Sequence, residues 1–64
     1  MEKKLLETVN KMITEAAREF HANGDQWTPA HERNIAKIHG ALEMLEAATG
    51  KKYVFDENGA KERS

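Results

Sequence analysis

The stretch that decides the fold is Asn23-Gly24-Asp25-Gln26-Trp27-Thr28-Pro29, which separates two long segments with helical periodicity. Asn23 and Gly24 tolerate the left-handed backbone conformation that closes a helix. Thr28 is a good N-cap, because its hydroxyl can accept a hydrogen bond from an unpaired backbone amide. Pro29 suits the first helical position, where no amide hydrogen is needed. The stretch therefore predicts two helices joined by a connection short enough to make them antiparallel neighbours.

The first segment, residues 2–22, predicts a helix with one buried stripe. Its apolar residues recur at spacings of one and three, and they are Leu5, Leu6, Val9, Met12, Ile13, Ala16, Ala17 and Phe20. On a helix these positions span an arc of about 140°. One neighbouring helix covers an arc of that width.

The second segment, residues 29–49, predicts a helix that ends at Gly50. Its apolar face carries Ile35, Ile38, Ala41, Leu42, Met44, Leu45 and Ala48. These positions spread over about 180°, which is wider than one neighbouring helix covers. The hairpin partner leaves Ala41, Met44 and Ala48 without a cover. The excess width predicts self-association, with a homodimer that completes a helical bundle favoured.

After Gly50 the pattern changes from helical to strand-like, because Tyr53-Val54-Phe55 has high β propensity. Residues 56–59 form a turn signal, and the polar residues 60–64 predict a frayed end with no second strand. Alternation sends Tyr53 and Phe55 to one side, and we expect them to pack near Leu5 and Leu6 on the first helix. The alternative is that this segment is offered to a partner strand.

These patterns predict an all-α fold: a two-helix antiparallel hairpin with a short extended C-terminal tail, in one domain over residues 1–64. The chain has 64 residues and no cysteine, so disulfides and thiolate metal sites are excluded. A domain of this size has a marginal core, which makes association the expected source of extra stability.

The net charge and the hydropathy of the chain limit the classes of partner that it is expected to bind. The net charge is −1, which gives no electrostatic attraction to nucleic acid or to an anionic membrane. No apolar run approaches the roughly 20 residues of a membrane span. The N-terminus passes directly into a charged periodic pattern, so we expect no signal peptide and a cytoplasmic location.

No catalytic or metal-binding constellation can be assembled from the sequence. The pair His31-Glu32 begins a zincin motif, but Ile35 stands where the second histidine is required. His31 and His39 lie about 12 Å apart along a helix, too far to share one metal. There is no cysteine nucleophile and no glycine-rich phosphate loop. We therefore expect no enzyme activity, no cofactor and no metal.

The predicted function is a non-enzymatic interaction or regulatory module, such as an inhibitor of the small phage-encoded kind, that self-associates and modulates a protein partner. The predicted partner or oligomer interface consists of Trp27, Ile38, Ala41, Met44, Leu45, Ala48, Tyr53 and Phe55. One alternative is an oligomer that binds a small anionic ligand such as a nucleotide through His31, Arg33 and Lys37. A second alternative is a weak nucleic-acid binder.

Two single residues carry further expectations. Gly40 lies in the middle of the second helix, where glycine costs about 1 kcal/mol relative to alanine. We therefore expect another backbone or an aromatic ring to approach it closely. Trp27 is expected to plug one end of the bundle. If it is exposed instead, it is an anchor for a partner, because tryptophan is enriched among the residues that dominate binding energies.

Overall fold

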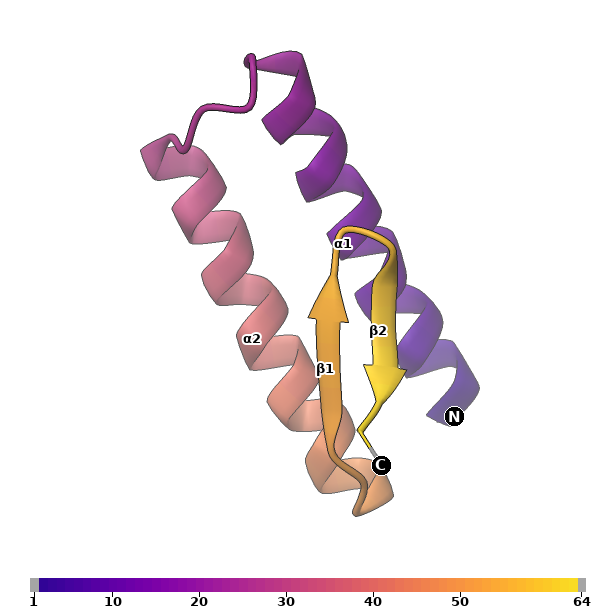
Figure 1. The fold of residues 1–64 in the computed structure, drawn as a ribbon. Helices are drawn as coiled ribbons and strands as arrows, with labels where there is room; N and C mark the ends of the chain where they lie inside the picture. The colour runs from indigo at the N-terminus through magenta and orange to yellow at the C-terminus, as the bar shows by residue number, and fades with distance from the viewer. Residues whose placement is uncertain (1, 64) are drawn as a thin grey trace.

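The computed structural model describes residues 2–63 as two helices followed by a β-hairpin. The elements are α1 (Glu2–Ala22), α2 (Pro29–Thr49), β1 (Tyr53–Asp56) and β2 (Gly59–Glu62). Figure 1 shows α1 and α2 running antiparallel in one layer, with the hairpin laid over one face of the pair. The fold is thus mainly helical and has two layers.

Both helices have the predicted boundaries, and local capping explains them. The Thr28 hydroxyl accepts a hydrogen bond from the His31 backbone N–H at 3.1 Å, and Pro29 follows at the first helical position. Gly50 ends α2 with φ at 72°, and its N–H donates to the Glu46 carbonyl. Gly24 has φ at 71° after the end of α1. The antiparallel helix pair predicted from the sequence is therefore confirmed.

The C-terminal segment is a hairpin, so the predicted single extended tail with a frayed end is wrong. β1 and β2 pair antiparallel, from Tyr53 opposite Glu62 to Asp56 opposite Gly59. The tight turn is supported by the Asp56 carboxylate, which accepts from the Asn58 N–H at 2.9 Å. A polar strand can form here because main-chain hydrogen bonds, not its own side chains, hold it to β1. The all-α description therefore gives way to two helices plus a small sheet.

The core lies between the helices and under the hairpin. Its buried members are Val9, Ile13, Ala16, Ile38, Leu42, Leu45 and Tyr53, and Leu6 and Phe55 pack against them. Side chains alternate along β1, since Tyr53 is buried and Val54 is half exposed. The expectation that Tyr53 and Phe55 pack against the two helices is confirmed. Tyr53 lines a surface depression together with Leu6 and Lys3 of α1.

Each helix also holds one strand by a polar side chain. The Asn10 side-chain oxygen of α1 accepts from the Ala60 N–H of β2 at 2.8 Å. The Glu46 carboxylate of α2 accepts from the Tyr53 N–H of β1, also at 2.8 Å. A β-carbon at Gly59 would lie 3.0 Å from the Asn10 oxygen, so glycine permits this close approach. These two contacts fix the hairpin on the helix pair.

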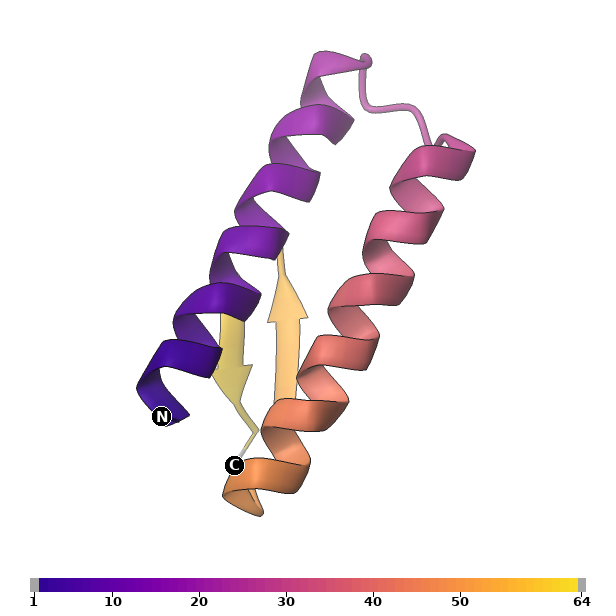
Figure 2. The ribbon, with the colours of Figure 1, turned by 180° about the vertical axis from the view of Figure 1, so that it is seen from behind.

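The hairpin covers only part of the helix layer. It lies beside the start of α1 and the end of α2, and its turn reaches about the middle of the helices (Figure 1). Figure 2 shows that, within residues 2–63, no other element covers the opposite face of the pair. Gly40 of α2 is open as well: a β-carbon there would meet nothing within 4 Å among the described residues. The close approach expected at Gly40 is therefore wrong within the chain.

Candidate functional site

A pocket of about 230 Å³ opens between the helices beyond the hairpin turn. Its lining residues come from α1, the interhelical connection, α2 and the hairpin. They are Ile13, Ala16, Ala17, Phe20, Trp27, His31, Ile35, Ile38, Phe55, Asp56 and Glu57. Nearly all are apolar or aromatic, which is the usual character of a binding pocket.

The pocket exists because the apolar stripes of the helices extend further than the hairpin does. Where the hairpin lies, Tyr53 packs into the core with buried stripe residues such as Val9, Leu42 and Leu45. Beyond the turn, Phe20 of α1 and Ile35 of α2 belong to the same stripes but remain partly exposed. The helical pattern therefore continues into a region with no covering element in the described part of the chain.

Three rings form one wall of the pocket. The His31 ring centroid lies 4.7 Å from that of Phe20 and 4.7 Å from that of Trp27, and the second pair is T-shaped. Phe20 and Trp27 are 6.5 Å apart, also edge to face. Trp27 nevertheless keeps 60% of its surface exposed. It therefore packs against the end of the helix pair without plugging it, which is the condition under which we expected a partner anchor.

His31 is an unusual residue for this wall. It is only 9% exposed, and its Nδ1 atom is buried with no hydrogen-bond partner among residues 2–63. A buried polar atom without a partner costs about 1–3 kcal/mol. An apolar side chain of similar size would avoid that cost. The unpartnered Nδ1 atom of His31 therefore costs stability in the described part of the chain.

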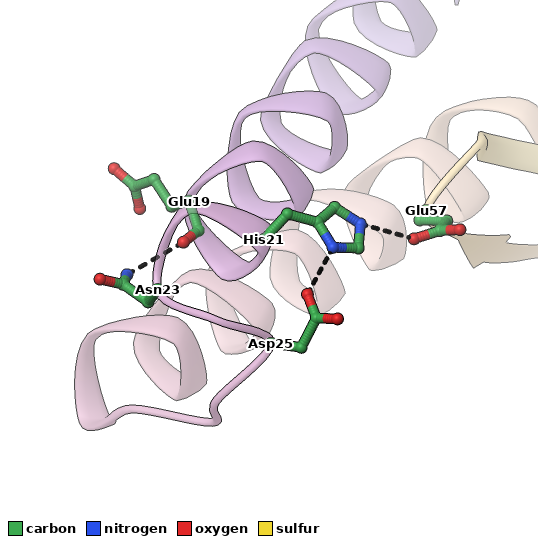
Figure 3. Close-up of polar contacts among 5 residues, drawn as sticks. All are labelled: Glu19, His21, Asn23, Asp25 and Glu57. Atoms are coloured by element: carbon green, nitrogen blue, oxygen red, sulfur yellow. Dashed lines mark hydrogen bonds and ion pairs between the residues drawn. The ribbon is translucent and has the colours of Figure 1, made fainter.

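Figure 3 shows the His21 ring between the side chains of Asp25 and Glu57, and Glu57 also lines the pocket. His21 Nδ1 lies 2.6 Å from Asp25 Oδ1, and His21 Nε2 lies 3.1 Å from Glu57 Oε2. The hydrogen bonds to Asp25 and then Glu57 raise the pKa of His21 above its ordinary value. When the ring is protonated, it donates to both carboxylates and links the interhelical connection to the hairpin turn.

The residues predicted for an interface fall into two groups. Ile38, Leu45 and Tyr53 are buried in the chain's own core, where they pack against other residues of the same molecule. The others keep some exposed surface, and they are Trp27, Ala41, Met44, Ala48 and Phe55. Trp27 and Phe55 line the pocket, whereas Met44 and Ala48 are exposed on α2 and Ala41 is partly buried against the core.

The residues predicted for an anionic ligand are not brought together. His31 lines the pocket, but Lys37 lines a separate depression that also contains Glu15 and Glu19 of α1. Arg33 is exposed and follows His31 by two positions, so it points about 160° away around the helix. Only His31 of the three contributes to the pocket.

Sequence reasoning did not find the charged cluster at the mouth. The His21–Asp25 contact is an i, i+4 pair of the kind that helical spacing predicts. Glu57 lies 36 positions from His21, and nothing local in the sequence brings the two together. Only a folded hairpin places Glu57 there.

Compared with protein-family models, with curated proteins and with solved structures, the chain shows no significant match. Among residues 2–63 there is no group of three or more His, Cys, Asp or Glu side chains placed to hold a metal ion. Neither of the two described helices is long and apolar enough to cross a membrane.

Proposed function

We propose that this chain is a small non-enzymatic interaction module that binds a protein partner through the pocket between its helices. The single observation that carries the proposal is the 60% exposure of Trp27 at the rim of an apolar pocket. Truncating such an aromatic anchor typically removes a large share of the binding energy of an interface. Folding alone gives no reason to leave the chain's one tryptophan mostly in water.

The size of the pocket supports a protein partner over a nucleotide. Pockets for drug-sized ligands and cofactors occupy about 300–1,000 Å³. The pocket here, at about 230 Å³, suits one or two inserted side chains. Its charged lining residues, Asp56 and Glu57, are acidic and would repel an anion. The anionic-ligand alternative therefore ranks below the protein partner, and a nucleic-acid partner ranks below both because the net charge is −1.

Capture experiments with matched variants test the proposal. The parent chain, Trp27→Ala and Val54→Ala are immobilised in parallel, and proteins retained from an extract of the source cells are quantified by mass spectrometry. Val54 is the control because it is half exposed on β1 and does not line this pocket. We expect a protein that the parent and Val54→Ala retain and Trp27→Ala loses. Its purified form should bind Trp27→Ala about tenfold or more weakly.

Two results would contradict a partner site in this pocket. The first is an identical set of retained proteins for all three chains. The second is a purified partner whose affinity does not depend on Trp27. Circular dichroism of Trp27→Ala should match the parent, because a mostly exposed side chain contributes little to folding.

Self-association is a second candidate function, carried by the exposure of Met44. Met44 is 67% exposed on α2, with Ala48 exposed and Ala41 partly exposed beside it. Methionine adapts well to irregular interfaces. Met44→Glu should shift sedimentation equilibrium toward monomer, whereas Ala36→Glu, at another exposed position of α2, should not. A parent that sediments as a monomer at every concentration would rule the candidate out.

A further inference from the structure

We infer that the partner segment presents one bulky apolar side chain next to Lys or Arg residues. The inference rests on the proposed function and specifies the chemistry of the partner at the same pocket. It follows from two features that meet there: apolar walls inside the pocket and carboxylates around its mouth.

The walls require an apolar anchor. Phe20, Ile35 and Ile38 supply the inner surface, and Trp27 stands at the rim. An inserted polar group would find few partners, because the Nδ1 atom of His31 is itself sealed from solvent. Burying an apolar side chain stabilises a complex in proportion to the area removed from water. A leucine, phenylalanine or methionine of the partner satisfies this requirement.

The mouth selects for positive charge beside that anchor. Asp56 and Glu57 line the pocket, and Asp25 joins them through His21. Two carboxylates therefore line the opening, and a third, Asp25, is joined to Glu57 through His21.

Only part of this negative charge is compensated. The basic groups beside the mouth are His21 and Arg18, which follows the lining residue Ala17 on α1. The three carboxylates Asp25, Asp56 and Glu57 against Arg18 and protonated His21 leave a local charge of −1, and −2 when His21 is neutral. Complementary charge at an exposed rim raises the association rate and selects partners more than it raises affinity. An arginine next to the anchor can also stack on the exposed face of Trp27.

A peptide selection tests the inference without knowledge of the natural partner. A display library of short random peptides is selected on the immobilised parent chain and counter-selected on Trp27→Ala. We expect the enriched sequences to share a large apolar residue with Lys or Arg beside it. The best peptide is then synthesised with two variants, one with its basic residues changed to Glu and one with its apolar anchor changed to Ser.

Binding is measured by the fluorescence of Trp27, which is the chain's single tryptophan. Both peptide variants should bind at least about tenfold more weakly than the selected peptide. The double variant Asp56→Asn/Glu57→Gln should bind the selected peptide several-fold more weakly, with a shallower dependence on salt. The control is Glu7→Gln/Glu43→Gln, which removes the same charge from exposed positions outside this pocket and should bind as the parent does.

The possible negative results distinguish the inferred chemistry of the partner from the proposed partner site itself. Trp27-dependent peptides that are acidic, or that lack an apolar anchor, overturn the inferred chemistry and leave the pocket as a partner site. Equal binding of the selected peptide and its Glu-substituted variant also overturns it. If no peptide depends on Trp27, the inference falls, and the capture experiment then decides independently whether the pocket binds a protein.

Discussion

Asn10→Ala removes the one side chain of α1 that hydrogen-bonds the backbone of β2 in residues 2–63. The Asn10 oxygen accepts from the Ala60 N–H at 2.8 Å in a partly buried position. β2 is otherwise a polar strand whose side chains at Lys61 and Glu62 are exposed. The substitution therefore tests whether this hydrogen bond holds the β-hairpin on the helices.

The magnitude follows from two opposing terms. Loss of the acceptor leaves a donor unsatisfied at a cost of about 1–3 kcal/mol, and partial burial of the Ala60 N–H favours the lower half of that range. Alanine is the better helix former by up to about 0.7 kcal/mol. The net expectation is a loss of about 1 kcal/mol in the free energy of unfolding, or a fall of roughly 4–8 °C in Tm for a domain of this size.

Urea unfolding followed by far-ultraviolet circular dichroism measures the effect as a lower midpoint with an unchanged slope. Asn10→Asp keeps an oxygen acceptor and should recover most of the stability. Thr14→Ala is the matched control: Thr14 is exposed one turn further along α1, where its hydroxyl bonds only the Asn10 carbonyl of the same helix. Helix propensity alone predicts that Asn10→Ala is more stable than the parent. That result would refute a role for Asn10 in holding β2.

Three further predictions concern caps and charges. Thr28→Ala should lower the free energy of unfolding by about 1 kcal/mol through loss of the α2 N-cap, and an unchanged urea midpoint would contradict this. Gly40→Ala should raise it by about 0.5–1 kcal/mol, because the added methyl group meets no atom of residues 2–63, and a loss of stability would point to an intermolecular contact. Hydrogen bonds to Asp25 and then Glu57 raise the pKa of His21 above 6.5, so its contribution is complete below that pH and is lost as pH rises through the folded-state pKa. His21→Gln should therefore destabilise more at about pH 6 than at about pH 8, and equal urea midpoint shifts at both would count against the bridge.

The helices could be predicted because their signals are local. The Thr28 hydroxyl accepts a hydrogen bond within the first turn of α2, and Pro29 occupies a position where no amide hydrogen is needed. The Gly50 N–H donates to the carbonyl four positions before it. The apolar periodicity predicted which face of each helix is buried. A helix with 3.6 residues per turn puts all the residues of such a stripe on one face, and no tertiary information is needed to see this. These features need no knowledge of the rest of the chain, and the structure confirms them.

The second strand could not be predicted in the same way. Residues 59–62 lack the apolar alternation that marks a strand, and in the structure only Gly59 among them is buried. Their support comes from Asn10, 50 positions earlier in the sequence, and from pairing with β1. The pocket was not predicted for the same reason. Phe20 and Ile35 belong to the apolar stripes and were therefore expected in the core. Only the short length of the hairpin shows that nothing in the described chain covers them.

Two departures from good packing lie together at the pocket end of the described helix pair. The core under the hairpin consists of apolar residues and Tyr53, whereas the pocket beyond it holds an unpartnered His31 Nδ1 and a mostly exposed Trp27. A leucine at position 31 would remove the cost of the unpartnered Nδ1 atom. Local violations of packing rules are expected where a function requires them, and they are unexpected at random surface positions. Their coincidence with the acidic residues Asp25, Asp56 and Glu57 is a further argument for the proposed binding role of this end of the helix pair.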